Sequence, residues 1–212
     1  MSTAYEGHEE DRAKIWSALG GTRGLLDSGL PSIVFLIAFN VAHSVKVAAG
    51  AAILLSLIFA VIRLVERDTI QHALSGIFGV AICAAFAMYS HSASGFYLPS
   101  IIKNAIFLAL YVVGNLANFP IIGLTLGPIL GENMEWRKNA PRLAVYKKVG
   151  WLWAGMFAIR IAIQLPLYLA KQVNLLGTAN IFLGYPLYLV VIWLTWQSLR
   201  RVPAVKPLGS SE

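Results

Sequence analysis

The 212-residue sequence is poor in charge and in cysteine. Only 13% of its residues are charged and 58% are hydrophobic, whereas soluble domains carry about 25% charged residues. The mean hydropathy is +0.68. This composition indicates that lipid surrounds most of the chain. A transmembrane helix needs about 20 mostly apolar residues to cross about 30 Å of hydrocarbon, so the chain has room for about six spans with short loops.

The sequence also lacks the residue patterns of a metal or catalytic site. Its one cysteine, Cys83, excludes an intrachain disulfide framework and any multi-cysteine metal or iron–sulfur centre. The four histidines are scattered without ligand spacing: His8, His43, His72 and His91. No P-loop, dinucleotide-binding fingerprint or nucleophile with a recognisable base is present. We therefore expect no metal, no cofactor and no enzymatic activity.

Charged residues separate the apolar runs and mark where spans begin and end. They predict an all-α, polytopic membrane bundle over residues 24–199, between a polar N-terminal segment, residues 1–23, and a C-terminal tail, residues 200–212. An apolar segment interrupted by Pro and Gly, residues 119–130, and a charged loop, residues 131–148, are expected inside the bundle. The six spans are predicted at residues 28–42, 44–64, 70–89, 98–116, 150–170 and 179–196.

The distribution of Lys and Arg predicts the orientation, because cytoplasmic loops retain these residues. With the N-terminus inside, thirteen of the 17 cations lie in cytoplasmic segments and only Lys46, Lys103 and Lys171 lie outside, while Arg160 stays within the membrane. The sequence thus predicts a multi-pass plasma (inner) membrane protein with both termini cytoplasmic. The same rule accounts for the net charge of +7, so we expect no nucleic-acid partner.

The first and fourth predicted spans open with similar residues. Ser28–Ile33 and Ser94–Ile101 both carry Gly, Leu, Pro, Ser and Ile in the same order, three spans apart and on opposite membrane faces. One interpretation is an inverted three-plus-three repeat, which is common in transporters. Chance similarity of the turn residues that precede apolar helices is the other.

Arg160 lies at the centre of the fifth predicted span, where a cation costs at least about 2.5 to 3.5 kcal/mol unless it is paired or hydrated. Gln164 follows one helical turn later on the same face. Asp27 is the acidic residue closest to a span. Arg160 is expected either to order the bundle through Asn115, Asn118 or backbone carbonyls, or to bind a carboxylate or anionic headgroup with its planar fork. We take these residues as the candidate intramembrane polar site.

The interrupted segment, residues 119–130, contains two prolines and glycines spaced four apart. It predicts a re-entrant or broken helix beside a binding site, a close packing face with small-xxx-small spacing, or a connector that lies in the interface. The candidate packing or broken-helix residues are Pro120, Gly123, Gly127, Pro128 and Gly131.

The following loop is rich in cations. Such a segment can hold anionic lipid at about 1 kcal/mol per cation, although the positive-inside rule explains the same charges. The candidate lipid contacts are Arg137, Lys138, Arg142, Lys147 and Lys148.

The order of segments resembles the bacterial intracellular septation protein A family of small inner-membrane proteins, and more closely an actinobacterial membrane family related to it. The resemblance covers nearly all of residues 21–196, and Arg160 and Gln164 belong to the actinobacterial pattern. No motif in it is catalytic, so it implies a fold and an envelope-related role. It rests on Leu30–Phe39, Val61–Val65, Pro120–Ile122 with Leu126–Gly127, and Trp153–Phe157.

Two functions follow as hypotheses. The first is a non-catalytic role in cell-envelope or septation-related assembly, through contacts with other membrane proteins or a second copy of the chain. The alternative is a small transporter or lipid-handling protein with a polar site around Arg160. Membrane lipids are expected partners in both cases.

Overall fold

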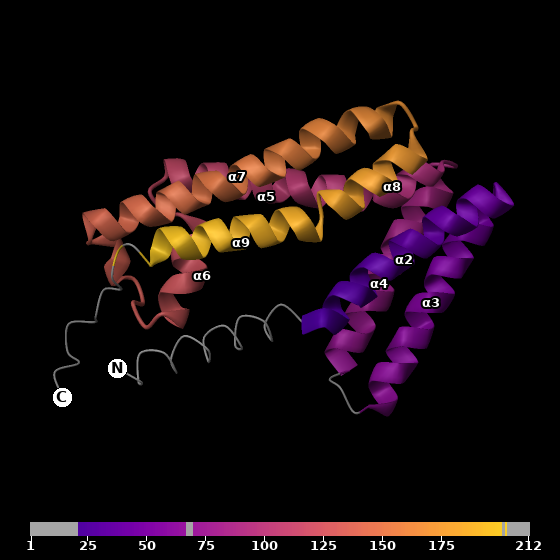
Figure 1. Ribbon diagram of the computed structural model, residues 1–212, viewed down its shortest axis with the longest axis horizontal. Helices are drawn as coiled ribbons and strands as arrows, with labels where there is room; N and C mark the ends of the chain where they lie inside the picture. The colour runs from indigo at the N-terminus through magenta and orange to yellow at the C-terminus, as the bar shows by residue number, and fades with distance from the viewer. Residues whose placement is uncertain (1–20, 67–69, 201, 203–212) are drawn as a thin grey trace. The chain divides into compact units, whose positions relative to one another are not determined.

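The computed structural model describes residues 21–66, 70–200 and 202, with side chains from residue 29 to 66 and from residue 76 onward (Figure 1). Every regular element in these ranges is helical. In chain order the α-helices are α2 (Gly21–Ala42), α3 (Val45–Val65), α4 (Ile70–Tyr89), α5 (Leu98–Leu116), α6 (Ile121–Ile129), α7 (Ala140–Leu169), α8 (Val173–Phe182) and α9 (Tyr185–Leu199). Two short 3₁₀ helices are η1 (Ala93–Tyr97) and η2 (Glu135–Arg137).

Several helices coincide with the predicted spans, and two begin earlier. Helices α4 and α5 cover the residues expected for the third and fourth spans, whereas α2 begins at Gly21 and α7 at Ala140. The early start of α7 shortens the expected loop, which ends at Asn139. Its side chain caps the helix by accepting a 3.1 Å hydrogen bond from the backbone N–H of Arg142, and Pro141 occupies the first turn.

The sixth predicted span is two helices rather than one. Pro186 has no N–H and its ring would clash with the carbonyl four residues earlier, which disfavours a continuous helix, and it instead occupies the first turn of α9. At the break, a side chain on Gly184 would lie 2.8 Å from the backbone oxygen of Asn180. The chain therefore changes direction at Leu183–Gly184 and resumes as α9.

The exposed surface of the helices is apolar, as expected for a protein that lies in lipid. Large side chains such as Leu54, Phe78 and Ile159 are exposed, while Asn104 and Arg160 are buried. Among the described side chains, four segments are long and apolar enough to cross a membrane: Val45–Val65, Ala93–Leu116, Ala140–Leu169 and Val173–Leu199. Gly29–Ala42 and Gly76–Tyr89 are shorter apolar helices within that part of the chain.

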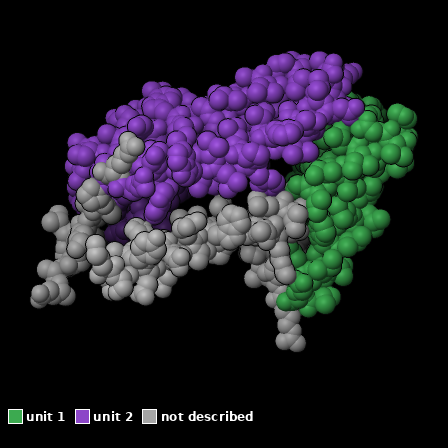
Figure 2. All heavy atoms as spheres, in the orientation of Figure 1, with its two compact units in different colours: residues 1–97 green, residues 98–212 purple. Residues whose placement is uncertain are grey.

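The chain divides into two compact units, Met1–Tyr97 and Leu98–Glu212, coloured separately in Figure 2. In the first unit, α3 packs against both α2 and α4. The buried face of α3 consists of small residues, which let helices approach closely: Ala48, Ala49, Ala52, Ser56 and Ala60. Phe35 of α2 stacks on Phe96 of η1 with ring centroids 3.9 Å apart.

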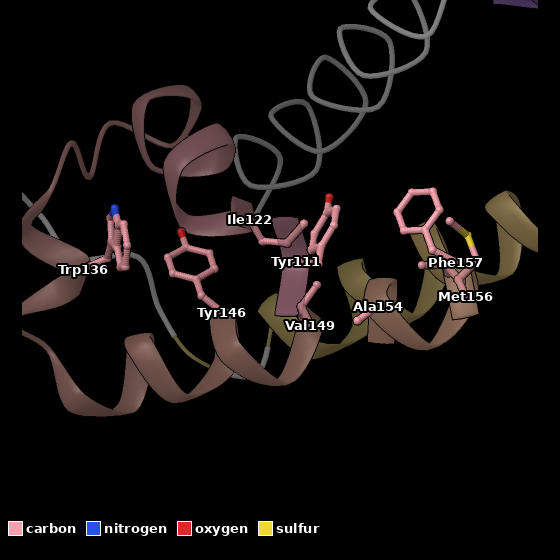
Figure 3. Close-up of a cluster of buried hydrophobic side chains, with 9 residues drawn as sticks. Tyr111, Ile122, Trp136, Tyr146, Val149, Ala154, Met156 and Phe157 are labelled. Atoms are coloured by element: carbon pink, nitrogen blue, oxygen red, sulfur yellow. The ribbon is translucent and has the colours of Figure 1, made fainter. Parts of the chain in front are cut away.

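The second unit is organised around α7, which packs against α5 on one side and against α8 and α9 on another. Its core combines aromatic and aliphatic side chains. Tyr111 stacks on Trp153 at 5.9 Å and Phe107 on Phe157 at 5.4 Å, which joins α5 to α7. Figure 3 shows the buried side chains following one another, from Trp136 and Tyr146 at one end to Phe157 at the other.

Candidate functional site

Arg160 projects from α7 toward the break between α8 and α9. One terminal nitrogen, Nη1, donates a hydrogen bond to the carbonyl of Leu183, the residue that caps α8. The other, Nη2, donates to Asn180 Oδ1 at 3.5 Å, and the guanidinium lies 5.4 Å from the ring centroid of Tyr188. A cation at a helix C-terminus stabilises the exposed carbonyls there. Arg160 therefore satisfies a backbone carbonyl that the break leaves without an intrahelical partner.

A chain of amide side chains continues from Arg160 across three helices. Gln164 Nε2 on α7 donates to Asn180 Oδ1 on α8 at 3.3 Å, and Asn104 Nδ2 on α5 donates to Gln164 Oε1 at 3.1 Å. Arg160 is 4% exposed, Gln164 1% and Asn104 0%. These residues form the Arg160 cluster: Asn104, Arg160, Gln164, Asn180 and Tyr188.

The charge of Arg160 is not balanced within the described part of its unit. The two carboxylates between residues 98 and 200 are Glu132 and Glu135, and they pair with Arg142 and Lys138. Arg160 Nε is also buried without a hydrogen-bond partner among the described residues. The cluster therefore holds a positive charge and an N–H that can donate to an anionic group.

Of the partners that the sequence predicted for Arg160, the structure shows a backbone carbonyl, that of Leu183, but neither asparagine. Asn115 Nδ2 instead donates to the carbonyl of Lys147 at 3.0 Å, and Asn118 Oδ1 accepts from Lys147 Nζ at 2.7 Å. Both asparagines therefore belong to a contact between α5 and the first turns of α7. Asp27 lies in α2, in the stretch whose side chains are outside the described part of the structure. Gln164 does join Arg160.

The interrupted segment forms α6, whose glycines pack within the chain. A side chain on Gly123 would lie 2.8 Å from the Trp136 ring, and one on Gly127 would lie 2.7 Å from Trp136 Nε1 and from the carbonyl of Asn133. Pro120 precedes α6, Pro128 lies in its last turn, and Gly131 follows it with φ +71°. The small-xxx-small face is therefore covered by Trp136, which is fully buried.

A buried ion pair lies beside Trp136. Glu132 Oε1 lies 2.5 Å from Arg142 Nη2, and Glu132 Oε2 accepts a 2.7 Å hydrogen bond from the Tyr146 hydroxyl. Arg142 Nη1 also donates to the carbonyls of Leu199 and Val202, at 3.4 and 2.6 Å. This ion pair therefore connects the loop after α6, the start of α7 and the end of α9.

The predicted lipid contacts divide into two groups. The side chain of Arg142 is only 3% exposed and carries the ion pair, which removes it from a lipid-facing surface and argues against the lipid contact predicted for it. Arg137, Lys138 and Lys148 are exposed, and Lys147 is half-buried. Arg137 lies 4.1 Å above the Phe119 ring, and Lys138 pairs with Glu135 at 3.0 Å. These four remain candidates for contact with lipid headgroups.

Comparison with known protein families identifies a matching family. A family model described as "Protein of unknown function (DUF3159)" covers residues 19–206. The chain belongs to this family. No curated protein and no solved structure matches it. The match thus spans α2 to α9, and its description assigns no role to any residue.

Sequence analysis did not identify three members of the Arg160 cluster in this DUF3159 chain. Asn104, Asn180 and Tyr188 lie in predicted spans, where an asparagine is itself a polar signal. Their register against Arg160 depends on how α5, α8 and α9 pack on α7. In the described residues, no group of three His, Cys, Asp or Glu side chains is arranged to hold a metal ion.

Proposed function

We propose that this DUF3159 protein binds the anionic group of a small solute or of a lipid at the Arg160 cluster, and that it acts as a small transporter or lipid-handling protein. The main support is Arg160 itself. Its guanidinium is buried, and the described carboxylates of its unit are paired with other cations. A buried cation is costly unless something compensates it, and a carboxylate or phosphate would do so.

The break between α8 and α9 supports the same function. It interrupts Val173–Leu199, a segment long enough to cross the membrane. The residue before α9 is Gly184, which has no side chain to cap the helix, and the first turn of α9 carries the positive end of the helix dipole. Discontinuous spanning helices beside polar side chains are characteristic of substrate sites in transporters.

The orientation is part of this proposal. We infer six spans, with α2 and α4 crossing the membrane alongside the four longer segments, and both termini in the cytoplasm. The support is the Lys and Arg distribution, together with helices of 22 and 20 residues for α2 and α4. In this orientation the first ten residues of α7 extend into the cytoplasm, and Arg160 lies near the middle of the bilayer.

A role in envelope or septation-related assembly, which was the first hypothesis from the sequence, is here the second candidate, and it rests on the family resemblance. The glycine face of α6 packs against Trp136 of the same chain. Anionic lipid at Arg137, Lys138, Lys147 and Lys148 is a further proposed partner, since these cations lie outside the buried ion pair.

Binding measurements on the purified protein in nanodiscs would test the proposal. We expect saturable binding of acetate or inorganic phosphate, or an anionic phospholipid that remains bound in native mass spectra. Solute binding would favour transport, and a retained lipid would favour lipid handling. Arg160→Lys keeps the charge but loses the planar fork, and we expect at least about tenfold weaker binding.

The matched control is Arg137→Lys, because Arg137 lies on the surface of the same unit. It should leave binding at the Arg160 cluster unchanged. The proposal is wrong if the wild-type protein binds none of these anions and retains no anionic lipid.

A further inference from the structure

The guanidinium of Arg160 determines which group donates and which accepts in each hydrogen bond of the Arg160 cluster. An arginine can only donate, so Asn180 must present Oδ1 to Arg160 Nη2. Asn180 Oδ1 then also accepts from Gln164 Nε2, which turns Gln164 Oε1 toward Asn104. Asn104 must in turn present Nδ2. Reversing any one amide would place two donors or two acceptors against each other.

This order leaves an acceptor and a donor unused. Asn104 Oδ1 is buried without a hydrogen-bond partner among the described residues, and so is Arg160 Nε. Asn104 as a whole is 0% exposed. An unsatisfied buried polar atom costs about 1 to 3 kcal/mol, more when the group is charged. The two atoms require opposite partners: Nε needs an acceptor, and Asn104 Oδ1 needs a donor.

We propose that the ligand of the Arg160 cluster is a small anion that also carries a hydroxyl or ammonium group. Its carboxylate or phosphate accepts from Arg160, and its hydroxyl or ammonium donates to Asn104 Oδ1. This inference rests on the proposed function and specifies its substrate class. A free hydroxy acid, an amino acid and a hydroxyl-bearing phospholipid headgroup share this chemistry.

Matched pairs of anions, with and without a hydroxyl group, show whether the site needs a hydrogen-bond donor on its ligand in addition to the negative charge. Acetate and glycolate differ by one hydroxyl, and phosphatidylmethanol lacks the hydroxyls of phosphatidylglycerol. In nanodiscs, we expect the wild-type protein to prefer glycolate over acetate, or phosphatidylglycerol over phosphatidylmethanol, by about tenfold. A preference confined to the lipid pair would identify a headgroup, and one confined to the acids a free solute.

Asn104→Leu removes the acceptor and leaves Arg160 in place. Because Asn104 Nδ2 also donates to Gln164, the variant is judged by its ratio of affinities and not by its affinity for acetate, and we expect it to lose the preference for glycolate over acetate. Asn115→Leu is the matched control, since Asn115 is equally buried on α5 but bonds to the carbonyl of Lys147. It should keep the preference.

The outcomes distinguish this inference from the proposed function. Arg160-dependent binding with equal affinity for both members of each pair would overturn the inference and leave the proposed function in place. Absence of any anion binding would overturn both. If Asn104→Leu does not fold, the preference of the wild-type protein still tests the inference. A site that needs no donor from its ligand would bind both members of each pair equally well.

Discussion

At the scale of single residues, Glu132 and Arg142 form a buried ion pair in the second unit. Both side chains are at most 3% exposed, and each makes further hydrogen bonds: Glu132 accepts from Tyr146, and Arg142 donates to the carbonyls of Leu199 and Val202. Removing one partner of such a pair leaves an uncompensated buried charge, which is costly. Glu135 and Lys138, in the same segment, form an ion pair that is much more exposed to solvent.

Glu132→Gln should lower the free energy of unfolding by about 3 to 5 kcal/mol, because Arg142 loses its counter-charge in a buried position. Glu135→Gln should change it by less than about 1 kcal/mol, since Lys138 is 75% exposed. Denaturation in mixed micelles, followed by tryptophan fluorescence, would measure both. Equal losses in the two variants would show that the buried pair is not the stronger contact. Adding Arg142→Met to Glu132→Gln should restore part of the loss.

At the scale of elements, α6 is held against the rest of its unit by the close approach of Gly123 to Trp136. Nine residues of helix are about 13 Å long, too short to cross the membrane. Packing on Trp136, not length, therefore determines where α6 lies. Gly155 on α7 is the opposite case, because a side chain there would meet nothing within 4 Å.

Gly123→Ala should destabilise the protein by about 1 to 3 kcal/mol, because the added methyl group overlaps the Trp136 ring. Gly155→Ala should be neutral or stabilising by up to about 1 kcal/mol, as alanine is the better helix former. Thermal unfolding in detergent would compare the two. Combining Gly123→Ala with Trp136→Leu makes room for the methyl group, so the effect of the alanine should be smaller in that background. An undiminished effect would contradict the packing explanation.

At the scale of the whole molecule, the proposed topology predicts which loops face the cytoplasm. Cys83 is the only cysteine, so Cys83→Ser gives a background without thiols. In that background, Lys171→Cys and His91→Cys should react with a membrane-impermeant maleimide in intact cells, because both residues are exposed beyond helix ends. Lys138→Cys should react only after permeabilisation. Labelling of Lys138→Cys in intact cells would show that the proposed orientation is wrong.

The division into two units falls between Tyr97 and Leu98, where the fourth span was expected to begin. Each unit contains three spans in the proposed topology, as an inverted repeat would require. The units differ in detail, since α6 and the α8–α9 break belong to the second. The repeat therefore remains a prediction.

Much of the helix pattern follows from local sequence. The positions of α3, α4 and α5 follow from apolar runs between charges and turn residues, which act within one segment and need no tertiary information. Arg160 and Gln164 could be paired from spacing alone, because residues four apart share a helix face. Gly184 and Pro186 also carry a local signal for the break that the spacing of charges does not reveal.

The tertiary structure decided which polar residues meet. The sequence showed that Arg160 needs partners, but Asn115, Asn118, Asn104 and Asn180 are all asparagines in or beside apolar helices. Only the packing of α5 and α8 on α7 places Asn104 and Asn180 in the Arg160 cluster. The same holds for Arg142, which resembles its cationic neighbours in sequence and is buried by a glutamate ten residues earlier. Apolar patterning is a local property, whereas the pairing of buried polar groups depends on helix register.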